Sequence, residues 1–143
     1  MRLIGLDHGS RRIGVAIGDT ETRLAFARPA LQRTNAEADV RAIGQLARTE
    51  GTQTVVLGLP CNMDGSEGRQ AAAARDFGAR LAAIGLTVAY QDERLTSWQA
   101  AELIGPRRGR ARRSGELDSA AARLILQEYL DAFHPPTSPQ EAE

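Results

Sequence analysis

Three acidic residues stand where they could do chemistry together. Asp7 ends a short apolar run, Glu93 follows another such run, and Asp118 lies in the first turns of the last expected helix. A bare carboxylate is costly to bury, and converging carboxylates repel one another, which raises their pKa values. A divalent cation would remove that repulsion, and an all-oxygen ligand set suits Mg²⁺ or Mn²⁺ better than zinc.

Such a set of acids predicts hydrolysis of phosphodiester bonds. In two-metal nucleases the ions lie about 3.5 to 4 Å apart, one activating water and the other stabilising the leaving oxygen. We expect two Mg²⁺ or Mn²⁺ ions held by Asp7, Glu93 and Asp118, with Asp7 bridging both. The predicted enzyme class is therefore a hydrolase acting on ester bonds.

Two of these acids, Asp7 and Asp118, also have a plainer interpretation. Asp7 and Gly9 could simply shape a turn, because both residue types favour turns. Asp118 could be an exposed acid stabilised by the dipole at a helix N-terminus. However, Asp118, Ala122, Ile125 and Tyr129 recur at helical spacing and form one mostly apolar stripe. This phase favours an Asp118 that faces the sheet.

Positive charge is concentrated in one segment, although the formal net charge is zero. All 18 basic residues are arginine, and five of them fall within residues 107–113: Arg107, Arg108, Arg110, Arg112 and Arg113. The guanidinium fork suits bidentate contacts with phosphate, and neutralising phosphates drives nucleic-acid binding. We expect this segment to hold a polyphosphate backbone beside the metals.

The elements that position these residues begin with a predicted β-hairpin, residues 2–6 and 13–18. Its bulky residues alternate with glycine and alanine, which gives a small face that another element can approach closely. The continuous apolar run 54–59 indicates a central strand, covered on both faces and parallel to the first. The other expected elements are strands over 23–29 and 86–90 and helices over 35–50, 66–84, 97–104 and 114–133.

This order predicts an α/β domain with a mixed five-stranded sheet, an antiparallel meander followed by parallel strands, and helices on both faces. Asp7 and Glu93 would lie at its carboxyl edge, where ligands bind in open α/β sheets. The length of 143 residues fits one domain, which we place at residues 1–134, with a flexible tail over 135–143.

Three further features of the sequence concern the cellular location, the single cysteine and one loop. No apolar run approaches the roughly 20 residues of a membrane span, and no signal peptide is evident, so we expect a soluble, cytoplasmic protein. Cys61 is the single cysteine, which excludes an internal disulfide and favours a packing role. The loop from Gly58 to Gly68 could receive a phosphate at the following helix, or form only the turn and cap.

Four blocks carry a resemblance to a known family: Leu6–Ala16, Gly58–Glu67, Asp92–Ser97, and Asp118–Ala121 continuing through Ile125–Leu130. In this order, over nearly the whole chain, they resemble the YqgF family. The resemblance implies a three-layer ribonuclease H-like fold, similar to that of Holliday junction resolvases. It also implies a metal-dependent nuclease in the maturation of small-subunit ribosomal RNA, with Asp7, Glu93 and Asp118 as metal ligands. The family often carries lysine where Arg11 stands, and we assign Arg11 and Arg12 to nucleic-acid binding.

Other functions stay open at this point. The chain could be a Holliday junction DNA resolvase or a non-catalytic factor that binds ribosomal RNA or junction DNA. An actin-like or sugar-kinase-like phosphotransferase is disfavoured, because those folds pair two related domains. Expected partners are structured RNA or branched DNA, including ribosomal precursor particles, and no membrane. The sequence leaves both RNA against DNA and monomer against homodimer undecided.

Overall fold

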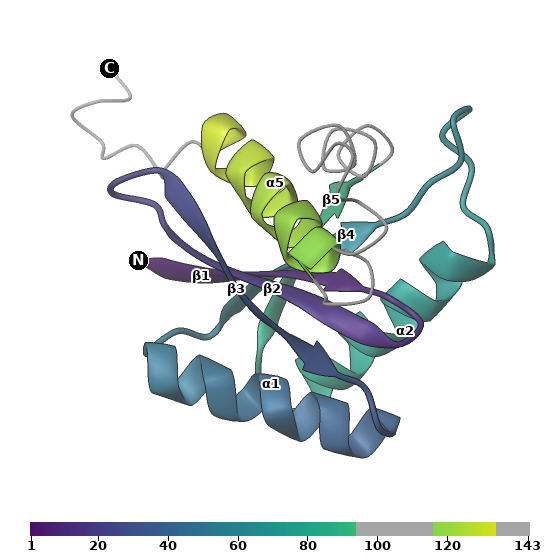
Figure 1. Cartoon of the computed structure of the whole chain (residues 1–143), viewed down its shortest axis with the longest axis horizontal. Helices are drawn as coiled ribbons and strands as arrows, with labels where there is room; N and C mark the ends of the chain where they lie inside the picture. Colours follow the sequence, from purple (N-terminus) through teal and green to yellow (C-terminus); the bar gives the residue numbers. More distant parts are fainter. Residues whose placement is uncertain (94–115, 134–143) are drawn as a thin grey trace.

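The computed structural model describes residues 1–93 and 116–133, which form a five-stranded sheet with helices on both sides (Figure 1). The strands are β1 (Arg2–His8), β2 (Arg12–Asp19), β3 (Leu24–Gln32), β4 (Thr54–Leu59) and β5 (Thr87–Asp92); the helices are α1 (Ala36–Glu50), α2 (Arg69–Ala83) and α5 (Glu116–Ala132). The predicted helix over 97–104, the arginine segment 107–113 and the tail over 135–143 lie outside the described residues.

The sheet is mixed, with strand order β3-β2-β1-β4-β5. β1, β2 and β3 form the predicted antiparallel meander. β4 pairs in parallel with β1 on one side and with β5 on the other. Its residues Val55 to Leu59 are buried, so the prediction of a covered strand parallel to the first is confirmed.

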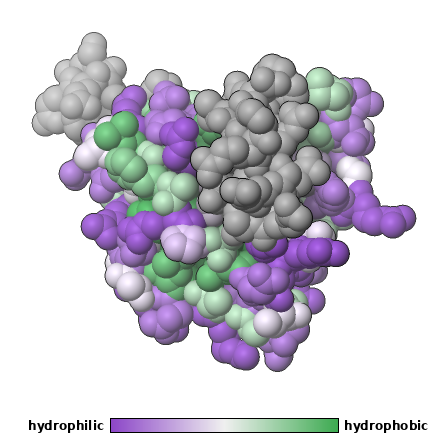
Figure 2. Space-filling view, viewed as in Figure 1, coloured by the Kyte–Doolittle hydropathy of each residue, from purple (hydrophilic) through white to green (hydrophobic). Residues whose placement is uncertain are grey.

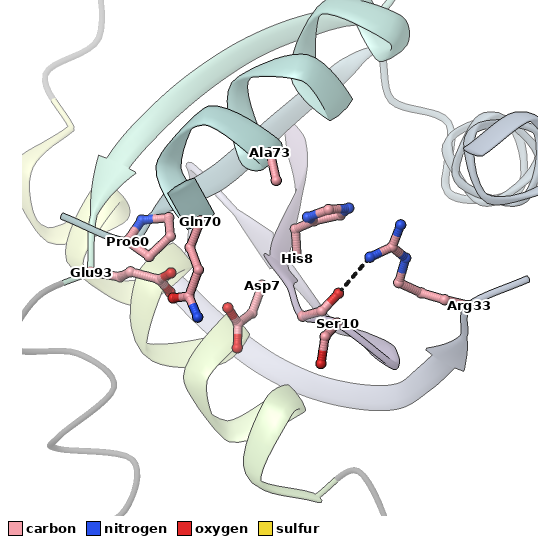
Figure 3. Close-up of a pocket in the computed structure, with 9 residues that line it drawn as sticks. Asp7, His8, Ser10, Arg33, Pro60, Gln70, Ala73 and Glu93 are labelled. Carbon is pink, nitrogen blue, oxygen red and sulfur yellow. Dashed lines mark hydrogen bonds between the residues drawn. The ribbon is translucent and has the colours of Figure 1, made fainter. Parts of the chain in front are cut away.

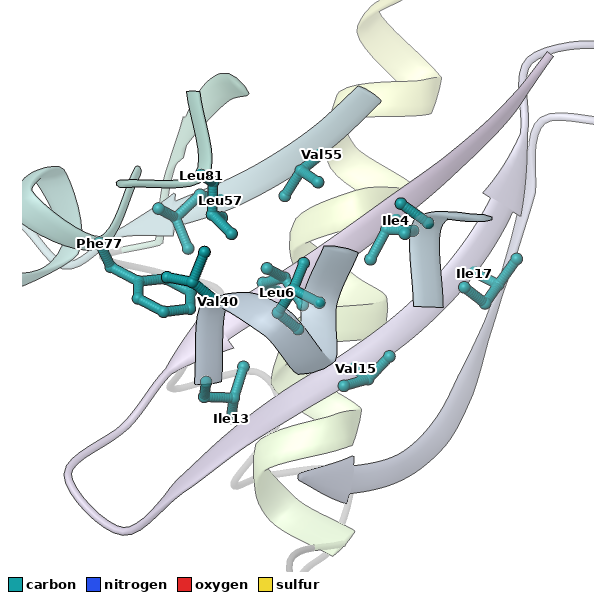
Figure 4. Close-up of a cluster of buried hydrophobic side chains, with 12 residues drawn as sticks. Ile4, Leu6, Ile13, Val15, Ile17, Val40, Val55, Leu57, Phe77 and Leu81 are labelled. Atoms are coloured by element: carbon teal, nitrogen blue, oxygen red, sulfur yellow. The ribbon is translucent and has the colours of Figure 1, made fainter. Parts of the chain in front are cut away.

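Two hydrophobic layers hold the helices to the sheet. On one face, α1 and α2 contribute Val40, Ile43, Phe77 and Leu81 to a cluster with the bulky residues of β1, β2 and β4 (Figure 4). On the other face, α5 packs Ile125, Leu126 and Leu130 against the sheet. Figure 1 shows α5 crossing the face opposite α1 and α2. The arrangement confirms the predicted layered α/β fold.

The small face of the hairpin is covered by α5. A Cβ added at Gly5 would lie 2.7 Å from the Cβ of Leu126, and one at Gly14 would overlap the backbone carbonyl of Asp118. Glycine at these positions lets the helix backbone approach the strands closely, as the alternation predicts. The contact between Gly14 and Asp118 fixes where the first turn of α5 lies.

Local signals set the bounds of α1 as predicted. The side chain of Asn35 accepts a hydrogen bond from the N–H of Ala38 at 2.9 Å, which caps the helix. Gly51 ends it in the left-handed conformation, with φ of 69°, which glycine adopts without strain.

Several boundaries differ from the prediction: β1, for example, continues to His8 instead of ending at Leu6. β3 continues past Pro29 to Gln32, because it is an edge strand and its pairing with β2 shifts register at this point; proline is tolerated at such positions. α2 begins at Arg69 rather than Ser66 or Glu67, because Glu67 forms a β-bridge with Cys61. β5 runs on to Asp92 because its last residue pairs with Leu59 of β4.

The surface seen in Figure 2 is mostly polar, with apolar residues interspersed. The largest apolar exposures on the sheet are at edge strand β3, where Leu24 and Phe26 are more than half exposed. Among the helices of the described residues, none has the length and apolar character needed to cross a membrane.

Candidate active site

Asp7 and Glu93 line the same cavity, which has a volume of about 340 Å³ (Figure 3). Asp7 is the penultimate residue of β1, and Glu93 directly follows β5. Both strands run parallel to β4, so their carboxyl ends meet at one edge of the sheet. The two acids are therefore brought together as their positions in the sequence predict.

The side chain of Glu93 reaches this cavity past the end of β4. The N–H of Glu93 donates to the carbonyl of Leu59 at 3.2 Å. A Cβ on Gly58 would lie 2.9 Å from Glu93 Oε2 and 2.5 Å from Ile125 Cδ1. Gly58 thus leaves the space that the carboxyl group occupies, a role that the sequence pattern alone does not indicate.

Each of the two carboxyl groups changes the pKa of the other. Burial raises the pKa of Glu93 to about 9, and the charge of Asp7 and a hydrogen bond with it add to the shift. Burial also raises the pKa of Asp7 to about 6, opposed by that hydrogen bond and reinforced by the charge of Asp118. At neutral pH Glu93 therefore keeps its proton and donates a hydrogen bond to the ionised Asp7.

Asp118 lies close enough to act on Asp7 electrostatically, and it forms an ion pair with Arg12, whose Nη1 is 3.8 Å from its Oδ2. Its neighbour Ser119 fixes this end of α5, since the hydroxyl donates to the carbonyl of Arg28 at 2.6 Å. The buried face of α5 includes Ala122 and Ile125, as predicted, but the Asp118 side chain is 28% exposed. Asp118 thus lies at the margin of that face.

The donor chemistry of this corner fits a divalent cation. Glu93 is only 5% exposed, yet its Oε2 has no hydrogen-bond partner among the described residues. A buried oxygen without a partner is unfavourable unless a cation or a proton donor approaches it. Within residues 1–93 and 116–133, no three acidic, histidine or cysteine side chains are gathered tightly enough to count as a preformed metal centre.

The other predicted contact residues divide into two groups. Arg11 is exposed at the turn between β1 and β2, and Arg12 is half-buried against Asp118. Arg107, Arg108, Arg110, Arg112 and Arg113 lie outside the described residues.

The loop after β4 forms a compact turn. Asn62 and Ser66 are joined by backbone and side-chain hydrogen bonds, the latter at 2.9 Å. Pro60 of this loop lines the cavity. These bonds agree with the interpretation of the loop as a turn.

Three further residues shape the cavity and were missed from the sequence. His8 stacks on Phe77 with ring centroids 4.6 Å apart, and burial and the charge of Arg33 lower its pKa, which keeps it neutral. Arg33 lines the cavity, and the buried Asp39 pairs with it. A signal for Asp39 existed, because it shares a helical stripe with Ile43 and Ala47.

A family model described as "RuvX: Holliday junction resolvase" matches residues 1–132. The chain belongs to the RuvX family. This is the YqgF family to which the four sequence blocks pointed.

Relatives cover nearly the whole chain. A Myxococcus xanthus protein is 44% identical over 138 residues, 95% of this chain and 91% of its own. A Moorella thermoacetica protein is 44% identical over 133 residues, 92% of this chain and 95% of its own. Both carry the name "Putative pre-16S rRNA nuclease".

Solved structures show the fold. RuvC of T. thermophilus in complex with Holliday junction substrate matches with a TM-score of 0.56 at 11% identity, over 92% of this chain and 94% of that one. The fowlpox virus Holliday junction resolvase matches with a TM-score of 0.58 at 10% identity, over 93% and 100% of the two chains. The ribonuclease H-like fold expected from the sequence is therefore confirmed.

Proposed function

We propose that this chain is a metal-dependent endonuclease that cleaves the precursor of small-subunit ribosomal RNA. The observation that carries the proposal is the buried pair Asp7 and Glu93 at the carboxyl edge of the sheet, with a Glu93 oxygen that has no hydrogen-bond partner in the described part of the chain. The name shared by the relatives supports the choice of substrate. Such a role would be carried out in the cytoplasm on ribosomal precursor particles.

Asp7 and Glu93, with Asp118 beside them, are the residues that would hold one or two Mg²⁺ or Mn²⁺ ions. When bound, these ions would activate water and stabilise the leaving oxygen of an in-line displacement. Glu93 must release its proton to become a ligand, because a carboxylate coordinates only when ionised. Arg12 orients Asp118 through their ion pair.

A second substrate is favoured by the description of the family, which names a Holliday junction resolvase. Carboxylates and arginines act on phosphate groups, which RNA and DNA share. A resolvase that cuts a junction symmetrically would need a two-fold dimer.

The test is cleavage of two labelled substrates, a precursor ribosomal RNA fragment and a four-way DNA junction, with Mg²⁺, Mn²⁺ or EDTA. We expect metal-dependent cutting by the wild type and none by Asp7→Asn, which should still bind. Asp76→Asn is the matched control, because Asp76 is an exposed acid on α2 that pairs with Arg80 outside the cavity.

The label that is cut identifies the substrate. Binding without cutting under every metal condition would overturn the nuclease in favour of a non-catalytic factor. Equal cleavage by Asp7→Asn and the wild type would overturn the assignment of the site.

A further inference from the structure

Arg33 lies at the end of the cavity away from Glu93 (Figure 3). It follows β3 and precedes α1. The cavity is lined by Asp7, His8, Gly9, Ser10, Arg33, Pro60, Gln70, Ala73 and Glu93. Among the described residues that line the cavity, Arg33 is the one arginine or lysine. One end of the cavity therefore carries the acids Asp7 and Glu93, and the other end carries the guanidinium of Arg33.

Two anchors hold the Arg33 guanidinium. Its Nε donates to Asp39 Oδ2 at 3.2 Å, and its Nη1 donates to the carbonyl of Gly9 at 2.9 Å, the bond drawn in Figure 3. Asp39 is 4% exposed and also accepts from the N–H of Thr34 at 3.1 Å. A guanidinium fixed in this way loses little further entropy when it binds a ligand.

The anchors leave donors for a ligand. They use Nε and Nη1, and Nη2 makes no hydrogen bond within the described part of the chain. A fixed guanidinium with free N–H groups suits the oxygen atoms of a phosphate. A purely structural arginine would need only the bonds to Asp39 and Gly9 and would not have to line the cavity.

We propose that Arg33 binds a non-scissile phosphate of the nucleic-acid strand whose scissile bond lies at Asp7 and Glu93. This inference rests on the proposed nuclease function and deepens it. The acids and Arg33 are at separate ends of the cavity, so the guanidinium contacts a different phosphate from the one at the acids. Arg33 is thus a substrate-binding residue that fixes the position of the strand.

The test measures binding of the labelled RNA fragment and the four-way DNA junction in EDTA over a range of salt concentrations. Losing one phosphate contact lowers the slope of log K against log salt by about 0.7 for a single strand and about 0.9 for duplex DNA. We expect this change for Arg33→Gln. Arg41→Gln is the matched control, because Arg41 is exposed on α1 and does not line the cavity, and its slope should equal that of the wild type.

Kinetic measurements distinguish an Arg33 that contacts the substrate from an Arg33 that only holds Asp39 in place. With metal present, Arg33→Gln should raise KM with little change in kcat, the pattern for a contact made equally in the ground and transition states. Arg33→Lys should also raise KM, because a single ammonium paired with Asp39 cannot present the same fork to a phosphate. The lysine variant serves if Arg33→Gln fails to fold.

A wild-type slope and KM in folded Arg33→Gln would overturn the inference, as would a wild-type KM in Arg33→Lys. Either result leaves cleavage by the wild type intact, so it counts against Arg33 alone. A wild type that binds both substrates and cuts neither counts against the proposed function, while the salt slope still reports on the Arg33 contact.

Discussion

The carboxyl groups of Asp7 and Glu93 interact although their strands are not neighbours in the sheet. β4 lies between β1 and β5, and the Glu93 side chain reaches Asp7 through space that Gly58 of β4 leaves open. The pair therefore depends on a residue that carries no functional group of its own.

Gly58→Ala should disrupt this pair. The added methyl group would lie 2.9 Å from Glu93 Oε2 and 2.5 Å from Ile125 Cδ1, and overpacking of this kind costs about 1–3 kcal/mol. We expect a lower free energy of unfolding in urea and a loss of metal-dependent cleavage.

Gly44→Ala is the control for that variant. Gly44 lies within α1, and its added Cβ would lie 3.0 Å from the end of the Ile84 side chain. Ile84 is about half exposed and can move, and alanine is favoured over glycine in a helix by about 1 kcal/mol. Cleavage by Gly44→Ala should match the wild type; a similar loss in both variants would contradict the specific role of Gly58.

The parts of the fold that were predicted correctly rest on local signals. The alternation of glycine with bulky residues in β1 and β2, the apolar run of β4 and the Asn35 cap are all encoded within a few residues. The start of α2 was wrong because it depends on pairing between Cys61 and Glu67 across a loop. Such a pairing leaves no periodic signal in the sequence.

The candidate site divides in the same way. Asp7 and Glu93 could be predicted, because the carboxyl ends of parallel strands share an edge. Arg33 could not, because its place in the cavity follows from the extension of β3 beyond Pro29 and from its bond to the Gly9 carbonyl. The sequence pattern ends this strand at Pro29 and carries no signal that places Arg33 at the site.

The pH dependence of stability without metal should report on the acid pair. The pKa of Glu93 is raised from 4.5 to about 9 and that of Asp7 from 3.8 to about 6. At a pH between the ordinary pKa and the raised pKa of each group, the folded chain binds more protons than the unfolded chain. The free energy of unfolding therefore falls as pH rises from about 4 to about 9. Urea denaturation in EDTA at several pH values measures this slope. Glu93→Gln should flatten it, and an equal slope in wild type and Glu93→Gln would contradict the assignment.

Mg²⁺ or Mn²⁺ should raise the melting temperature of the wild type and leave that of Asp7→Asn nearly unchanged. A ligand at about 100 times its Kd adds about 2.7 kcal/mol to the free energy of unfolding. Melting temperatures with Mn²⁺, Mg²⁺ or EDTA measure the effect. In EDTA, Asp7→Asn should melt at or above the wild-type temperature, because it replaces a buried carboxylate with a neutral amide and removes the repulsion between Asp7 and Asp118. An equal metal-induced shift in both proteins would show that the ion binds elsewhere.

Gly14→Ala should separate Asp118 from the other two acids. Its added Cβ would overlap the carbonyl of Asp118 and lie 2.9 Å from the N–H nitrogen of Ser119. These are backbone atoms, so α5 itself must move, and we expect a cost at the upper end of the overpacking range, about 3 kcal/mol.

Hydrogen exchange should show this displacement as faster exchange of the amides in the first turns of α5, with those of α1 unchanged. The Asp118 charge would move away from Asp7 and from Arg12, its ion-pair partner. The stabilisation by Mn²⁺ should therefore fall even at temperatures where the variant is folded. The contrary result would be a folded Gly14→Ala chain in which hydrogen exchange in α5 and stabilisation by Mn²⁺ both equal those of the wild type. It would mean that the packing of Gly14 against α5 does not position Asp118 for metal binding.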